Sequence, residues 1–152
     1  MKRVAGMFAL VLALVATTAS VKAQSKTSIN GTWKMNVSKS QAEEGIQGIT
    51  VKFEQTGATL REDLSMLTPD GERKATLNYT MDGKESMNRW GSREVKSTAK
   101  SEGDSLTLEW KGEDHSLLRK ITVSQDGKVM TMVVRQVSPG GQREDTIVLD
   151  KQ

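Results

Sequence analysis

The stretch INGTWKMNVSKS, residues 29–40, alternates between apolar and polar side chains from its first residue. Polar residues occupy the even positions, and the odd positions up to residue 37 hold Ile29, Gly31, Trp33, Met35 and Val37. In an extended chain, successive side chains point to opposite faces, so a period of two gives one apolar face and one polar face. The stretch therefore predicts a β-strand that is buried on one side.

The same period recurs through the rest of the chain and predicts nine strands in all. The other eight lie in the segments ITVKFEQ (49–55), ATLREDLSM (58–66), KATLNYTM (74–81), SREVKSTAKSE (92–102), SLTLEW (105–110), LLRKITVS (117–124), VMTMVVRQV (129–137) and TIVLD (146–150). Only SKSQAEEG (38–45) predicts a short helical turn.

Glycine lies in most of the connections, often beside aspartate or proline, as in TPDGER, MDGKE and SQDGKV. Asp-Gly is a strong hairpin signal, and hairpins join antiparallel neighbours. An open sheet of this size would expose two edges, which closure into a barrel removes. We therefore predict an all-β fold, an up-and-down antiparallel barrel of eight to ten strands. A two-sheet sandwich of the same short strands is the alternative.

The N-terminus has the three parts of a secretory signal peptide. Lys2 and Arg3 precede the apolar run 4–16, and Val21-Lys22-Ala23 forms a small-x-small cleavage signal. The apolar run is shorter than the roughly 20 residues that a membrane-spanning helix needs. We expect a signal peptide at 1–23, cleavage near Ala23, and one secreted or periplasmic domain at 24–152.

The leader also accounts for the basic charge of the chain. It holds three of the 22 Lys and Arg residues and none of the 19 Asp and Glu residues, so the mature domain carries 19 of each. A nucleic-acid-binding domain would show a net basic face, so we expect no nucleic-acid partner. We also expect no stable membrane span after cleavage. The chain has no cysteine, so the fold must hold without disulfides.

The tetrapeptide GTWK (31–34), on the first strand after an export signal, resembles the start of lipocalins and of the wider calycin group. The mature chain is similar to small secreted bacterial lipocalin-like proteins in GTWKMNVSKS, MDGKES, REVKSTAKSEGDSLTLEW, SQDGKVMTM and VLDKQ. The resemblance implies that Trp33, helped by Gly31, plugs one barrel end and packs against an arginine of a late strand, either Arg119 or Arg135. The second lipocalin motif, Thr-Asp-Tyr, is absent. The segment between Val37 and Gly48 leaves no room for the long helical lid of fatty-acid-binding proteins.

Catalytic motifs are scarce. The chain has no Gly-x-Ser-x-Gly elbow and no phosphate-binding glycine loop. The single histidine, His115, lies in the turn GEDHS without partners for a triad or a zinc site. We therefore expect a protein that is not an enzyme and that has no cofactor and no metal, with an enzyme acting in the lumen as a further alternative.

The methionines favour a binding cavity, because methionine adapts to varied apolar ligands. Met35, Met66, Met81, Met87, Met130 and Met132 are many for a domain this poor in aromatic residues, although they could equally be core filler. The candidate ligand-binding residues are Arg119, Glu62, Met66, Met81, Trp90, Trp110, Met130 and Met132.

Two of these candidates are charged residues on strand faces that are otherwise apolar. Glu62 shares a face with Leu60 and Leu64, and Arg119 shares one with Leu117 and Ile121. An inward charge must meet an opposite charge, a polar ligand head or water. The two predicted strands lie on opposite walls, so a direct bridge would need a narrow lumen. Arg119 could instead hold a carboxylate or phosphate head. Other outcomes are a bulge that turns one charge to water, or stacking of Arg119 on Trp33.

These observations favour an exported, non-enzymatic barrel that binds a small apolar or amphiphilic ligand. The alternative is a protein-interaction or inhibitor barrel with a filled lumen, which would use the loop 82–94. In that case Trp90 would be an exposed contact residue; in a carrier it could cover the barrel mouth. The sequence leaves open the ligand, the open end and the oligomeric state.

Overall fold

The computed structural model describes residues 28–152, and the predicted leader lies outside the described residues. The described chain forms ten β-strands and one short 3-10 helix. Their bounds are β1 Gly31–Met35, η1 Val37–Lys39, β2 Gly48–Thr56, β3 Thr59–Thr68, β4 Gly71–Thr80, β5 Ser86–Trp90, β6 Arg93–Glu102, β7 Ser105–Lys111, β8 Ser116–Val123, β9 Val129–Ser138 and β10 Gly141–Lys151.

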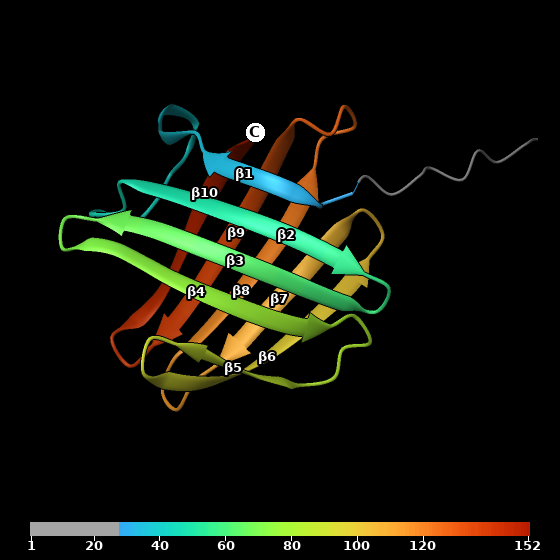
Figure 1. The fold of residues 1–152 in the computed structure, drawn as a ribbon. Helices are drawn as coiled ribbons and strands as arrows, with labels where there is room; N and C mark the ends of the chain where they lie inside the picture. The colour runs from blue at the N-terminus through green and yellow to red at the C-terminus, as the bar shows by residue number, and fades with distance from the viewer. Residues whose placement is uncertain (1–27) are drawn as a thin grey trace, which may run out of the picture.

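The strands form a single antiparallel sheet in the order β4-β3-β2-β1-β10-β9-β8-β7-β6-β5. Neighbouring strands in this order are also consecutive in the sequence, except that β1 pairs with β10 as well as with β2. Figure 1 shows β1–β4 crossing in front of the strands β6–β10, so that the sheet curls around a central space. The prediction of an up-and-down antiparallel barrel with eight to ten strands is confirmed, and the sandwich alternative is wrong.

The tenth strand, β5, lies inside the segment 82–94 that the sequence predicted as a loop. Its inward positions hold Ser86, Asn88 and Trp90, whereas Met87 and Arg89 are exposed. Two of the three inward residues are polar, so the apolar half of the alternation is missing there. The prediction of a long 82–94 loop is therefore wrong.

The sheet order begins at β4 and ends at β5, and a side chain joins these two strands. The Asn88 Nδ2 donates to the carbonyl of Asn78 at 2.8 Å, and the backbone N–H of Asn78 donates to Asn88 Oδ1 at 2.8 Å. The amide of Asn88 thus makes the two hydrogen bonds that a neighbouring strand would otherwise make. This contact brings the two ends of the sheet together.

Trp33 lies in the packed end of the barrel. Its side chain is fully buried, and its indole Nε1 donates to the carbonyl of Ile29 at 2.8 Å. It belongs to the hydrophobic core, whose other buried members include Ile29, Met35, Val51, Phe53, Leu60, Met130 and Leu149. The role of Trp33 as a plug of the barrel stays a prediction, and the cation beside its ring is not the predicted arginine.

The cation over the Trp33 ring is Lys151, whose Nζ lies 5.2 Å from the ring centroid. The prediction of Arg135 in this role is wrong, since its exposed guanidinium binds Glu144 at 3.0 Å. Arg135 lies between the cavity-lining residues Val134 and Gln136 on β9, so its side chain points to the outer face.

The backbone conformation at Gly31 favours glycine. Its φ of +120° is a conformation that residues with a side chain rarely adopt. A Cβ added there would lie 3.1 Å from Cε of Lys151, the residue that covers Trp33, so that this lysine side chain would have to shift slightly.

Residues 36–47, which we call the strap, connect β1 and β2. The predicted helical turn appears here only as η1, which begins one residue earlier and ends at residue 39. Gln41 and Thr146 exchange two backbone hydrogen bonds of 2.7 and 2.9 Å, which holds the strap against β10. Of the residues that the structure describes, none forms a helix long and apolar enough to cross a membrane.

Candidate ligand-binding site

A cavity of about 250 Å³ lies inside the barrel beneath the strap. Its walls are Ile46, Ile49, Leu64, Met66, Trp90, Trp110, Leu117, Met132, Val134 and Ile147, and its polar lining is Glu43, Arg119, Gln136, Arg143 and Asp145. Ligand cavities commonly measure about 300–1,000 Å³, so this one suits a small molecule. The apolar walls favour a ligand that is mostly hydrocarbon.

Three polar side chains meet at the inner end of the cavity. Arg119 donates from Nη1 to Glu62 Oε1 and from Nη2 to Glu62 Oε2, the latter at 2.7 Å. The Tyr79 hydroxyl donates to Glu62 Oε2 and accepts from Arg119 Nη2, both at 2.9 Å. All three residues are buried. A two-pronged arginine–carboxylate pair of this kind is among the strongest hydrogen-bonded contacts in proteins.

The electrostatics of this cluster keep it overall neutral. Burial raises the pKa of the Tyr79 phenol, so the hydroxyl keeps its proton. Burial by itself would lower the pKa of Arg119, but the electrostatic interactions and hydrogen bonds with Glu62 and Tyr79 together outweigh burial, and the pKa is raised. The guanidinium therefore stays protonated opposite the Glu62 carboxylate, and the two charges cancel.

The bridge spans the lumen. β3 carries Glu62 and β8 carries Arg119, and these strands are five positions apart in the sheet order, on opposite walls of the barrel. Of the cluster only Arg119 lines the cavity. The pair therefore forms the cavity floor and separates it from the packed end around Trp33.

Two buried polar side-chain atoms have no hydrogen-bond partner among the described residues. They are Nε of Arg119 and Oγ of Ser97. Ser97 lies on the inward face of β6 between the buried residues Val95 and Ala99. A buried donor without a partner costs about 1–3 kcal/mol.

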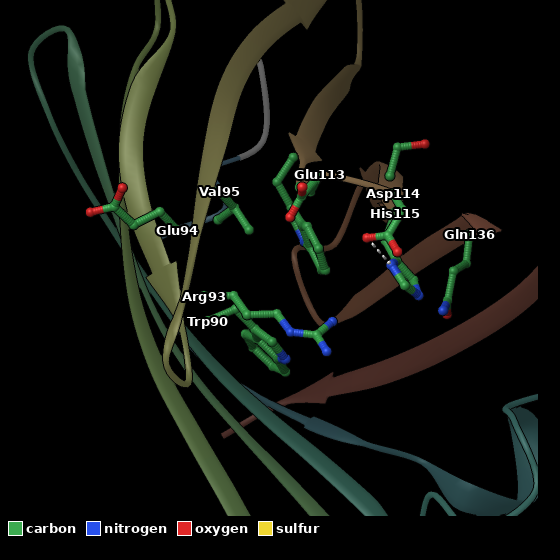
Figure 2. A pocket seen from close by; sticks show the side chains of 11 residues that line it. Trp90, Arg93, Glu94, Val95, Glu113, Asp114, His115 and Gln136 are labelled. Carbon is green, nitrogen blue, oxygen red and sulfur yellow. Dashed lines mark hydrogen bonds and ion pairs between the residues drawn. The ribbon is translucent and has the colours of Figure 1, made fainter. Parts of the chain in front are cut away.

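A second, larger pocket of about 660 Å³ adjoins the cavity, and we call it the vestibule. Trp90, Trp110 and Gln136 line both spaces. The two indoles are stacked, with ring centroids 6.2 Å apart. Figure 2 shows the guanidinium of Arg93 extending past Trp90 into the vestibule. The tryptophan pair thus lies where the vestibule and the cavity meet.

Charged residues also fasten the strap over the cavity. Arg143 on β10 binds Glu43 of the strap at 2.7 Å and Asp145 at 2.9 Å. The hydrogen bond from Arg143 holds the pKa of the Glu43 carboxyl below its usual value of 4.5. The same hydrogen bond is the main cause that raises the pKa of Arg143. Both groups are therefore charged at neutral pH.

The structure brings together five of the eight predicted ligand-binding residues on the cavity lining: Met66, Trp90, Trp110, Arg119 and Met132. Glu62 lies behind Arg119. Met130 and Met81 belong to or pack against the core cluster and do not line the cavity. Met87 is 62% exposed. Sequence reasoning missed Tyr79 as a partner of the charges, although the period of two placed it on the apolar face of its strand.

His115 lies in the connection between β7 and β8, with Nδ1 3.3 Å from Asp114 Oδ1. Figure 2 places this pair at the rim of the vestibule. Within residues 28–152, no three His, Cys, Asp or Glu side chains are grouped so that they could hold a metal ion.

Comparison with solved structures places the barrel among calycin-type folds. A secretory abundant heat soluble protein from Ramazzottius varieornatus matches with a TM-score of 0.66 at 14% identity, over 82% of this chain and 95% of its own. The "REP1-NXSQ fatty acid transporter" matches at 0.62 and 15%, over 81% and 95%. A zebrafish ileal bile acid-binding protein in complex with cholic acid matches at 0.54 and 16%, over 81% and 98%.

No protein-family model and no curated protein sequence matches this chain. The structural similarities therefore establish its fold, a nearly closed calycin-type barrel, as the sequence resemblance predicted.

Proposed function

We propose that this protein is a non-enzymatic barrel that binds a small, mainly apolar molecule in its interior. The observation that carries the proposal is the cavity of about 250 Å³ with apolar walls and one buried polar cluster at its floor. Solved structures of the same fold include a protein named as a fatty acid transporter and one named as bile acid-binding. These names support the class of ligand and leave its identity open.

The test is binding of an apolar fluorescent dye to the purified mature domain, with displacement by short-chain alcohols. Val134 lines the cavity, and its neighbour Val133 lies on the opposite face of β9. We expect Val134→Phe to fill the cavity and weaken dye binding at least about tenfold, while Val133→Phe, the matched control, leaves it unchanged. Saturable binding that is equal in both variants would show that the dye binds elsewhere.

The alternative of a protein-interaction barrel has lost its main support. Segment 82–94 contains β5, and Trp90 stacks on Trp110 instead of standing in solvent. Native mass spectrometry of the purified protein separates the two functions. A co-purifying small apolar molecule supports the carrier, whereas a ligand-free mass together with a captured protein partner supports the interaction module.

We further propose that the protein is exported. The support is the basic, apolar and small-residue succession of residues 1–23. N-terminal sequencing of the extracytoplasmic protein should then begin at Gln24. A protein that begins at Met1 and remains with the cells contradicts this proposal.

A further inference from the structure

We infer that the cavity selects uncharged ligands over anionic ones, and that Glu62 is the residue that sets this preference. The inference rests on the proposed function and specifies its ligand class. The carrying observation is the pairing of Arg119 with Glu62 at the cavity floor. This inference contradicts the sequence-based hypothesis that Arg119 holds the carboxylate or phosphate head of a ligand.

The first step concerns the hydrogen-bonding capacity of Arg119. A free guanidinium at the end of an apolar cavity would bind a carboxylate through two parallel N–H bonds. Here both terminal nitrogens already donate to Glu62, and Nη2 also donates to Tyr79. The two-pronged face of the arginine is therefore occupied by a carboxylate that the protein itself supplies.

The second step concerns charge. The side chains of Arg119 and Glu62 are 4% and 0% exposed, so water screens their charges little. A ligand carboxylate at this floor would lose its hydration and face the Glu62 carboxylate as well as the guanidinium. Because the pair is neutral overall, no group at the floor offsets the free-energy cost of burying a further charge.

The third step concerns the other charges that line the cavity and the vestibule. In the cavity lining, Arg143 is bound by both Glu43 and Asp145. The vestibule lining holds Arg93 and His115 together with the three acids Glu94, Glu113 and Asp114. These acids disfavour an anion beside either arginine.

An uncharged oxygen fits the same floor. Arg119 lines the cavity, and its buried Nε has no hydrogen-bond partner among residues 28–152. An alcohol or carbonyl oxygen can accept a hydrogen bond without adding charge. The ligand class that follows is a small apolar molecule with at most one or two uncharged oxygen groups.

The experiment compares decan-1-ol with decanoate, each displacing the fluorescent dye from the wild-type mature domain at pH 8, where decanoate is ionised. We expect the alcohol to bind at least about tenfold more tightly, since like charges in contact cost several kcal/mol. We also expect the affinity for decanoic acid, measured relative to decanol, to rise as the pH falls and the ligand becomes neutral. Equal affinities at pH 8, or no such rise, overturn the inference.

Glu62→Gln removes the internal carboxylate and leaves Arg119 charged. We expect this variant to gain at least about tenfold in affinity for decanoate while its affinity for decanol stays within about threefold. Glu54→Gln, at a half-exposed position on β2, is the matched control and keeps the wild-type ratio. A folded Glu62→Gln variant whose affinity for decanoate does not rise contradicts the role of Glu62.

If Glu62→Gln does not fold, the wild-type comparison and its pH dependence still decide the inference. Failure of the proposed function is a different result: neither dye, alcohol nor acid then binds in the cavity. Failure of the present inference requires that the cavity binds and prefers or equally accepts the anion.

Discussion

Asn88 on β5 forms two hydrogen bonds of 2.8 Å with the backbone of Asn78 on β4, at the junction where the two ends of the sheet meet. A side-chain amide carries one donor and one acceptor group in the same plane, as a peptide group does. At this junction a single side chain thus makes the kind of hydrogen bonds that paired strand backbones make elsewhere in the barrel.

Replacing Asn88 by alanine should open this junction. The N–H and carbonyl of Asn78 lose their partners, and we expect a loss of about 1–3 kcal/mol in the free energy of unfolding. Hydrogen exchange at the Asn78 amide should quicken. Ser86→Ala, at another inward position of the same strand, serves as the control and should change neither quantity. An Asn78 amide protected equally in both variants would contradict the bridging role.

Trp33→Ala should be among the most destabilising substitutions in the domain. The side chain is fully buried, and its indole N–H is bonded to Ile29. Truncation of a buried tryptophan costs about 3–5 kcal/mol. Chemical denaturation followed by circular dichroism measures the loss. Trp90→Ala, at the half-buried mouth, should cost less, and an unchanged midpoint for Trp33→Ala rules out the plug.

The buried ion pair predicts a non-additive result. Arg119→Met leaves the Glu62 carboxylate buried without its partner, which costs about 3–5 kcal/mol. Combining it with Glu62→Leu removes the second charge as well, and buried pairs replaced by apolar residues are often neutral or stabilising. We therefore expect the double variant to be more stable in urea than the single one. Additive losses would mean that the two side chains do not interact.

The strap should respond to pH through Glu43. Its folded-state pKa is lowered by Arg143, so the stabilisation is fully present above the unfolded value and is lost as the pH falls through the lower, folded value. Both side chains are almost half exposed, so the effect is at most about 1 kcal/mol. Wild type should exceed Arg143→Gln in urea midpoint at pH 7, and this advantage should vanish near pH 3. An advantage that persists at pH 3 would point to packing instead.

Local patterns in the sequence predicted the barrel. Alternation is a property of neighbouring residues, so nine of the ten strands and the inward direction of Trp33, Glu62 and Arg119 could be read from it. The Asp-Gly turns were equally local: at Gly83 and Gly127 the φ angles of +80° and +70° are those that glycine adopts without strain.

The tertiary structure alone decided the contacts between strands that are far apart in the sequence. Which cation reaches Trp33 depends on how β10 ends beside β1, and Lys151, rather than either arginine, lies there. The sequence pattern did not predict β5 because two of its three inward residues are polar, and one of them, Asn88, bonds to β4. Whether Glu62 meets a ligand or Arg119 depends on the width of the lumen. That width is set by the closure and stagger of all ten strands together, and a local period of two does not encode it.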